Sequence, residues 1–427
     1  MSESTRPAIP LSADEVAHLR SEFPLLARTG RAGSPITYLD ASATSQKPRV
    51  VIDAEADFYA RSNGAVNRGT HVLADEASAI YEDARAAVAG FVGADPDEIA
   101  WTKNATEAFN VVAYSLLDAT LAKHGAYQLG EGARIVVTRA EHHANLVPWQ
   151  RLAARVGAEF AWLDLTPDGR IDLDTLDVIT PNTAVVAFTH LSNVTGAFSP
   201  VTEIVAAARN VGALVVLDTC QSAAHVPLDL HALDVDVAAL SAHKMCGPTG
   251  IGALYVRREV AEALPPALVG GSMVADVAME TTTYQDPPLK FEAGTQPVAQ
   301  IAGWKAAVEF LSGIGMERVA AHERHITEAL IDAISAIDGV RLLGPAHTRD
   351  RVAVAAFTLG DVHPHDIGQV LDATDVAIRV GHHCAIPLHR FFGVRASARA
   401  SASLTTTVDE IDRLARGLEQ VRQFFIR

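Results

Sequence analysis

The sequence predicts an α/β protein with a mainly parallel sheet that carries helices on both faces. Short apolar runs of strand length alternate with amphipathic helical segments between residues 134 and 256. Strand–helix–strand repeats of this kind build parallel sheets through right-handed crossovers. Polar residues directly follow successive runs, which is typical of the sheet edge where open α/β folds bind ligands. The runs are Arg134–Thr138, Ala184–Thr189, Leu214–Leu217, Val235–Leu240 and Gly252–Val256.

Composition narrows the class of protein. The 427 residues allow two or three domains, and the formal charge of −16 argues against nucleic acid or an anionic membrane as the main partner. The N-terminal residues lack the basic start and apolar centre of a signal peptide, and no apolar run reaches membrane-spanning length. Three cysteines cannot form a disulfide framework, so we expect a cytoplasmic protein.

Local patterns predict the elements before residue 134. Ser12 and Glu15 form a capping box at the start of a helix that ends before Pro24. Asn104 and Thr106 follow a strand and precede a helix, an arrangement suited either to an anion or to an ordinary helix cap. The remaining elements predicted here are a strand at Ile36–Leu39, a helix at Arg49–Ala60, an amphipathic helix through Ala77–Phe91, a strand at Ile99–Thr102 and a helix at Ala108–Leu117.

The pattern changes after residue 256 and indicates a second, smaller α+β domain. The predicted elements are a long helical stretch at Pro297–Ile337, a strand at Val352–Leu359, a helix at Pro364–Ala373, a strand at Ala377–Val380 and a helix at Val408–Phe425. We therefore divide the chain into an N-terminal segment, residues 1–35, that packs with the small domain, a large domain, residues 36–300, and a small domain, residues 301–427.

Lys244 is the first residue whose setting suggests chemistry. It follows an apolar strand, and a desolvated lysine amine forms Schiff bases with carbonyl compounds, including pyridoxal phosphate. The alternative is a surface lysine at a strand end. The cofactor also needs an acid beside its pyridinium nitrogen, a phosphate cradle and a group on the ring face. These could come, in that order, from Asp218, from the helix start at Thr106 with Ser241 and His243, and from His142.

Cys384 lies in a loop framed by Gly381 and Pro387, a setting that suits a nucleophile better than a core position. Nearby Arg379 would favour its thiolate. Zinc binding is an alternative, but the spacing of the neighbouring residues does not match known structural zinc sites, so we predict no metal. The residues weighed for zinc are His382, His383, Cys384 and His389. Arg399 could hold a substrate carboxylate, a role for which Arg379 competes.

Taken together, motifs along nearly the whole chain resemble one family. The chain is similar to pyridoxal-phosphate cysteine desulfurases of the aminotransferase class V, fold-type I group, and most similar to the SUF-system (SufS-type) branch. The resemblance is carried by the motifs at 38–40 (YLD), 67–71 (NRGTH), 102–107 (TKNATE), 141–149 (EHHANLVPW), 190–194 (HLSNV), 218–222 (DTCQS), 241–244 (SAHK), 291–295 (FEAGT) and 379–385 (RVGHHCA).

The resemblance implies a role for each site residue. Cys384 would take sulfur from a substrate cysteine held on the cofactor, leaving alanine and an enzyme persulfide. Lys244 would hold the cofactor and shuttle a proton, and His142 would stack on the ring and assist. Arg399 and Arg379 would bind the substrate carboxylate. The other implied cofactor contacts are Asp218 at the ring nitrogen, Gln221 at the ring hydroxyl, Asn193 beside the ring and substrate, Ala105, Thr106, Ser241 and His243 at the phosphate, and Thr295 from the other subunit of a homodimer.

The resemblance also implies that a SufE- or SufU-like protein accepts the sulfur for iron–sulfur cluster assembly. Ala242, Ala105 and Thr405–Thr407 depart from the usual family pattern, so a paralogue that supplies a specialised biosynthetic pathway is an alternative. A selenocysteine lyase or cysteine-sulfinate desulfinase would share the cofactor residues. A plain aminotransferase would leave the cysteine loop without a role, and a non-enzymatic scaffold would not need Lys244, Asp218 and His142.

Overall fold

The computed structural model describes residues 8–67, 69–123 and 125–426 of the chain. Arg68, which belongs to one of the motifs above, and residues 1–7 of the predicted N-terminal segment lie outside these ranges. No helix in the described part is long and apolar enough to cross a membrane.

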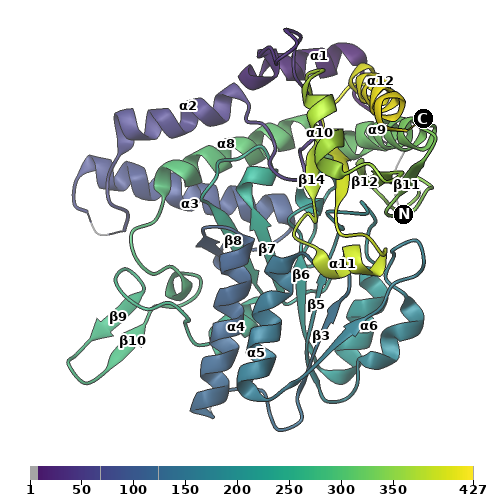
Figure 1. Ribbon diagram of the computed structural model, residues 1–427. Coiled ribbons are helices and arrows are strands. Elements are labelled where there is room, and N and C mark those ends of the chain that lie inside the picture. Colours follow the sequence, from purple (N-terminus) through teal and green to yellow (C-terminus); the bar gives the residue numbers. More distant parts are fainter. Residues whose placement is uncertain (1–7, 68, 124, 427) are drawn as a thin grey trace, which may run out of the picture.

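The larger of the two main sheets has seven strands, in the order β2-β8-β7-β6-β5-β3-β4 (Figure 1). The strands are β2 (Ile99–Thr102), β3 (Arg134–Thr138), β4 (Glu159–Leu163), β5 (Thr183–Thr189), β6 (Leu214–Asp218), β7 (Val237–Ser241) and β8 (Gly252–Val256). Only β8 runs antiparallel to its neighbours, whereas the pairs from β7 to β4 are parallel. The predicted α/β fold with a mainly parallel sheet is therefore confirmed, and the sheet has seven strands.

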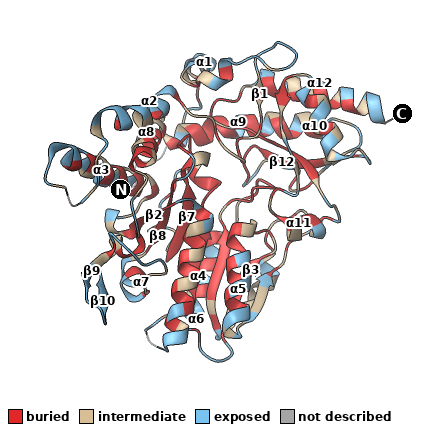
Figure 2. Ribbon diagram, turned by 60° about the vertical axis from the view of Figure 1, so that its left-hand side comes forward, coloured by how far each residue is buried: buried red, intermediate tan, exposed pale blue. Residues whose placement is uncertain are grey.

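The strands alternate their apolar side chains between the two faces of this sheet, as the period of two requires. Ile135 and Val137 belong to one core cluster, and Val136 between them belongs to another. The cluster of Ile135 and Val137 includes buried residues of helices α4 (Ala105–Ala122), α5 (Val147–Val156) and α7 (Arg258–Ala263). The cluster of Val136 includes buried residues of α3 (Val72–Val92), α6 (Val201–Val211) and α8 (Val298–Ile314). Figure 2 shows the buried sheet between helices whose outer faces are exposed.

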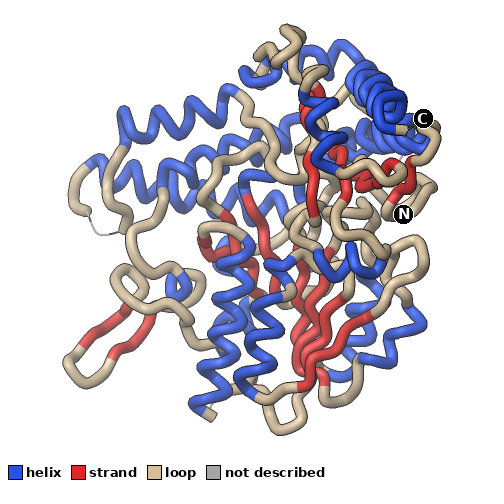
Figure 3. Tube along the Cα trace, viewed as in Figure 1, coloured by secondary structure: helices blue, strands red, loops and turns tan. Residues whose placement is uncertain are grey.

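The C-terminal part is built on a four-stranded antiparallel sheet, in the order β11-β12-β15-β14. Its strands are β11 (Val340–Leu342), β12 (Val354–Leu359), β14 (Arg379–Gly381) and β15 (Ser397–Ser401). Apolar residues of α9 (Met316–Ser335), α10 (Pro364–Asp372) and α12 (Val408–Phe425) pack on it to form a separate core cluster. The short helix α11 (Ile386–Phe391) follows the cysteine loop. Figure 3 shows these helices and strands above the large sheet.

The N-terminal residues contact the C-terminal part. Strand β1 (Thr37–Tyr38) pairs in parallel with β13 (Val376–Ala377). Arg20, in helix α1 (Ala13–Ser21), forms an ion pair with Glu410 at 2.7 Å. Strand β1 lies just beyond residues 1–35, and the packing of that whole segment with the small domain stays a prediction. The domain boundaries at residues 35 and 300 remain predictions.

Two further parts of the fold are helix α2 and a β-hairpin. Helix α2 (Arg49–Asp57) precedes α3, and both pack against α8. Strands β9 (Val274–Val277) and β10 (Thr282–Tyr284) form an antiparallel hairpin that projects away from the large sheet (Figure 1).

Two differences from the sequence-based expectations have clear physical causes. The helical stretch predicted at Pro297–Ile337 is two helices, because Gly315 between α8 and α9 has a φ of 92°, which an α-helix cannot contain. Strand β15 was not predicted, because its residues Ser397–Ser401 have small or polar side chains without apolar alternation. All five are buried between neighbouring strands.

Candidate active site

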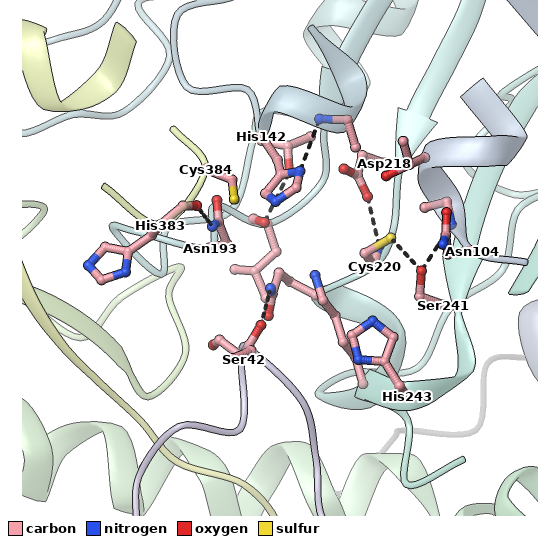
Figure 4. Close-up of a pocket in the computed structure, with 18 of the residues that line it drawn as sticks. Ser42, Asn104, His142, Asn193, Asp218, Cys220, Ser241, His243, His383 and Cys384 are labelled. Carbon is pink, nitrogen blue, oxygen red and sulfur yellow. Dashed lines mark hydrogen bonds between the residues drawn. The ribbon is translucent and has the colours of Figure 1, made fainter. Parts of the chain in front are cut away.

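A cavity of about 250 Å³ lies at the carboxyl ends of β5, β6 and β7. Figure 4 shows residues that line it, with Cys384 and His142 on one side and Ser241 and Asn104 on the other. Its walls contain every residue that the sequence predicted for the site, with the exception of Thr295: Ala105, Thr106, His142, Asn193, Asp218, Gln221, Ser241, His243, Lys244, Arg379, Cys384 and Arg399.

The register of the large sheet positions Asp218 and Ser241. Asp218 is the last residue of β6 and is aligned with Thr189 on one side and Ala239 on the other. Its carboxylate is buried and accepts a hydrogen bond from the backbone N–H of Cys220 at 3.0 Å. Ser241 ends the adjacent strand, β7. Because both residues sit on central strands, the core holds them at a fixed spacing.

The N-terminus of α4 approaches the same edge of the sheet. The backbone N–H of Ala105 donates to Ser241 Oγ at 3.0 Å, and the exposed Thr106 follows it. Gly252 makes this approach possible, since a Cβ there would lie 2.6 Å from the Leu240 carbonyl oxygen and 2.7 Å from Asn104 Cα. Free N–H groups and the helix dipole favour an anion at such a terminus.

Lys244 lies on the helical turn that follows β7, Ala242–Lys244. Its side chain is half-buried in the cavity wall, and among the described residues its amine takes part in no hydrogen bond or ion pair. The backbone carbonyl of His243 accepts hydrogen bonds from Ser45 N at 2.9 Å and Thr44 Oγ1 at 3.0 Å, which fix the turn. Burial, with Lys244 adding, lowers the pKa of His243 to about 4, so its ring is neutral at pH 7.

His142 is also neutral. Burial, with the charge of Lys244 adding to it, lowers its pKa to about 3. Its Nδ1 accepts a hydrogen bond from the backbone N–H of Ala144 at 3.1 Å. An accepting nitrogen carries no proton, so the neutral ring has its proton on Nε2.

Polar contacts from the large-sheet part hold the cysteine loop in place. His143 N donates to the Cys384 carbonyl at 2.7 Å, and its ring Nε2 accepts from Ile386 N at 3.1 Å. The side-chain amide of Asn193 donates to the His383 carbonyl at 2.8 Å. His383 and Cys384 have φ values of 49° and 55°, an uncommon conformation for residues other than glycine that the surrounding contacts must maintain.

The two predicted carboxylate-binding arginines are neighbours. Arg379 on β14 and Arg399 on β15 are direct cross-strand partners, so both point to the same face. Asp40 Oδ1 lies 3.2 Å from Arg399 Nη2, and Asp40 Oδ2 lies 3.8 Å from Arg379 Nη1. Arg399 is buried, so it is not a solvated surface arginine. Burial lowers its pKa to about 10, and Asp40 opposes that shift, so the side chain remains a cation at pH 7.

The remaining predicted residues join parts of the site that are distant in sequence. Gln221 Nε2 donates to the carbonyl of Ser42 at 3.0 Å. Asn193, in addition to its bond to the cysteine loop, accepts from Arg399 through its backbone carbonyl at 2.9 Å. Thr295 lies in a separate cavity, lined also by Tyr59 and Asn67.

The residues weighed for zinc do not gather around one point. His383 and His389 both turn to Ser397, whose Oγ lies 2.9 and 3.0 Å from their Nε2 atoms. The other two cysteines are buried: burial raises the pKa of Cys220 far above the usual range and that of Cys246 to about 12. Cys384 is the partly exposed one of the three.

The sequence did not single out several residues that complete the site. Asp40 directly follows the strand predicted at Ile36–Leu39, a position at which a polar residue is common, so only its pairing with the two arginines distinguishes it. Ser42 and the buried Cys220 also line the cavity.

The residues present fit pyridoxal phosphate. The α4 terminus beside Thr106 and Ser241, which the close backbone approach at Gly252 brings to the sheet edge, offers donors to a phosphate. The same cavity wall contains the amine of Lys244, which has no polar partner among the described residues, and the buried carboxylate of Asp218. This is the donor set that the cofactor requires.

Comparisons with known proteins agree with this fit. Residues 37–414 match the model of the family Aminotransferase class-V. The chain is 51% identical to "Probable cysteine desulfurase 2" of Mycobacterium leprae, over 98% of this chain and 99% of that protein. The crystal structure of the cysteine desulfurase CsdA (S-sulfonic acid) from Escherichia coli is similar with a TM-score of 0.87 and 35% identity, over 96% of this chain and 99% of that one.

A more distant solved structure shows the same fold. It is a variant of the protein C-DES with glycine covalently linked to its pyridoxal phosphate, and it matches with a TM-score of 0.78 and 24% identity, over 93% of this chain and 98% of that one. The family model and the full-length relatives lead to one assignment. The chain belongs to the aminotransferase class-V family.

Proposed function

We propose that this protein is a pyridoxal-phosphate-dependent cysteine desulfurase. The observation that carries the proposal is that Cys384 lines one cavity together with Lys244, Asp218 and the arginine pair Arg379–Arg399. In the reaction the C–S bond of L-cysteine breaks and an S–S bond forms on Cys384. The products are L-alanine and a Cys384 persulfide, so atoms and electrons balance without another reactant.

The bound cofactor would supply an electron sink that makes the bonds at the substrate α- and β-carbons labile. Lys244 would carry the cofactor and move the α-proton, for which its amine has no competing partner in the described chain. Asp218 would keep a positive charge on the ring nitrogen. Thr106, Ala105, Ser241 and His243 would bind the phosphate, and Gln221, Asn193 and His142 would contact the ring.

The arginine pair would orient the substrate. Arg399 is held by Asp40 and by the Asn193 carbonyl, and its Nε has no partner within the described residues. A guanidinium already oriented in this way can bind a substrate carboxylate with little loss of side-chain entropy. Arg379, at the cavity rim, would add a second positive charge. With the carboxylate bound here, the substrate sulfur would face the cysteine loop.

Sulfur would leave the enzyme through a protein acceptor. Cys384 is partly exposed, which supports transfer of its persulfide to a second protein rather than release of free sulfide inside a closed cavity. We propose an acceptor of the SufE or SufU type and a role in iron–sulfur cluster assembly, with supply of a specialised pathway as the alternative. A cytoplasmic location follows from the cysteine content and remains a prediction.

We also propose a homodimer. Large apolar side chains stay exposed near the ends of α2 and α3 and on the β9–β10 hairpin, which project on one side of the molecule in Figures 1 and 2. They include Tyr59, Val72, Val277 and the 96% exposed Met279. A patch of this kind marks a protein contact. The cavity that holds Thr295 is next to it, so a second copy could receive Thr295 at its phosphate site.

Alanine formation from L-cysteine, measured in the presence of a reductant, tests the function. Cys384→Ser should lower the rate by about a thousandfold or more while the cofactor absorbance persists, because the nucleophile is lost and the cofactor residues remain. Lys244→Ala should remove both the rate and the Schiff-base absorbance. Cys246→Ser, a buried cysteine outside this cavity, is the matched control for the thiol.

A wild-type rate in Cys384→Ser would contradict the assignment of the nucleophile. The same assay with selenocysteine and cysteine sulfinate separates the alternative functions, because those substrates release their β-substituent without a thiol nucleophile. A preference for either substrate that is independent of Cys384 would replace the proposed function.

A further inference from the structure

Three potential metal ligands meet at the mouth of the cysteine loop. They are His143, which belongs to the turn after β3, and His382 and Cys384, which follow β14. One ligand atom from each side chain lies within 4.8 Å of the other two. This set differs from the one weighed on the sequence, because it excludes His383 and His389 and recruits a histidine more than 200 residues earlier in the chain.

The chemistry of the three ligands selects the class of ion. Two imidazoles and a thiolate suit zinc and similar thiophilic cations, whereas Mg²⁺ and Ca²⁺ prefer oxygen ligands. Zinc–sulfur and zinc–nitrogen bonds of about 2.3 and 2.1 Å bring tetrahedral ligands to about 3.5 Å from one another. Rotations of the exposed His382 and the partly exposed Cys384 can close the remaining distance.

Existing contacts oppose binding only weakly. His143 Nε2 accepts one backbone hydrogen bond from Ile386, and His382 Nδ1 accepts one from Cys384 N, both at 3.1 Å. Metal–ligand bonds are stronger than either of these bonds. Arg379 and Arg399 line the same cavity and repel a cation, but Asp40 is paired with both. The thiolate supplies a further negative charge.

We propose that His143, His382 and Cys384 bind a zinc-class divalent cation from solution, and that this ion reversibly blocks the nucleophile. On binding, a sulfur–metal bond forms and the thiol proton leaves to solvent, so nothing is oxidised or reduced. Solvent completes the coordination. The ion is an inhibitor rather than a resident cofactor, and it joins the large-sheet part of the chain to the cysteine loop.

Alkylation of Cys384 by iodoacetamide tests the site directly. The holoenzyme is treated with chelator, desalted and labelled with or without one equivalent of Zn²⁺, and the labelled peptide is quantified by mass spectrometry. Cys220 and Cys246 are buried and give separate peptides. Zn²⁺ should slow labelling of Cys384 by about tenfold or more, and chelator should restore it. Mg²⁺ should have no effect. This readout does not depend on desulfurase turnover.

Three variants assign the ligands. His143→Ala and His382→Ala should each weaken protection by Zn²⁺ by about tenfold or more, measured from the Zn²⁺ concentration that halves the labelling rate. His347→Ala, an exposed histidine outside the trio, is the matched control and should bind as the wild type does. His382 is exposed, so its variant decides the question even if His143→Ala alters the loop. Absence of protection by Zn²⁺, or equal protection in the wild type and both variants, would overturn the proposal.

Discussion

The two halves of the candidate active site are held in different ways. The cofactor half, which comprises Asp218, residues 241–244 and the start of α4, sits on the ends of central strands and at one helix terminus. Its geometry follows from the register of the sheet and from a buried core. The cysteine half, which comprises residues 381–385 and the arginine pair, sits on a smaller sheet at the other wall of the cavity.

The cysteine half depends on individual polar contacts between segments that are far apart in the sequence. The pairs are Asn193 with His383, His143 with Cys384 and Asp40 with Arg399. The end of a central strand is held by packing contacts with many buried side chains, so a single substitution changes its position little. The cysteine half depends on a few polar contacts, so the loss of one of them can change the position of the loop. We therefore expect substitutions of these partners to affect sulfur transfer while cofactor binding is retained.

The largest effect is expected when the arginine pair loses its carboxylate. Asp40→Asn leaves Arg399 buried without a counter-charge, which should lower the free energy of unfolding by about 2–4 kcal/mol. Denaturant unfolding measures this change. Asp372→Asn is the matched control, because its ion pair with Arg31 is exposed on both sides and should contribute about 0–1 kcal/mol. Equal losses in free energy of unfolding in the two variants would show that the buried ion pair stabilises the protein no more than an exposed one.

A smaller effect, confined to turnover, is expected for the contact beside the nucleophile. His143→Ala removes the ring that accepts from Ile386 N, so the cysteine loop should shift and kcat for alanine formation should fall about 10- to 100-fold. Cofactor absorbance and affinity should stay unchanged, because the cofactor half keeps its sheet contacts. Val147→Ala, an exposed position just downstream, is the control. Loss of cofactor together with turnover would mean that the two halves are not independent.

A third expected effect is a change in the pH dependence of stability. Burial, with Arg399 adding, lowers the pKa of His383 to about 2 from 6.5, so the folded ring stays neutral while the unfolded chain takes up a proton below about pH 6.5. Its contribution to stability is therefore complete above pH 6.5 and is lost as the pH falls towards 2. His383→Gln should reduce the slope of unfolding free energy against pH by about 1.4 kcal/mol per pH unit in that window.

Denaturant titrations at pH 6.5, 5.5 and 4.5 would measure this slope, taking about 6.5 as the unfolded histidine value. His347→Gln makes the same substitution at an exposed histidine and should keep the wild-type slope. An unchanged slope in His383→Gln would mean that this ring takes up a proton in the folded protein at the same pH as in the unfolded chain. The cysteine half would then be more open to solvent than its contacts indicate.

Local sequence patterns were sufficient for most of the large sheet. Short apolar runs of strand length predicted β3, β6 and β8 closely, because a strand buried on both faces of a sheet needs only continuous apolar side chains. They failed for β15, whose residues are small or polar although they are buried. They also missed the exposed β4 edge and the break at Gly315, where the glycine lies within an otherwise continuous helical pattern.

The sequence by itself predicted which residues gather at the candidate site. Twelve of the thirteen predicted site residues line one cavity. The strand ends of a parallel sheet necessarily meet at one edge, which accounts for the residues on β6 and β7. The loop framed by Gly381 and Pro387 and the chemistry of arginine pointed to the cysteine and the two arginines. Only the tertiary structure decided how the nucleophile is held and what else meets it. The cross-strand alignment of Arg379 with Arg399, their pairing with Asp40 and the approach of His143 to Cys384 join segments separated by up to 359 residues. Such contacts leave no periodic signal in the sequence, since they depend on how two separately packed sheets come together.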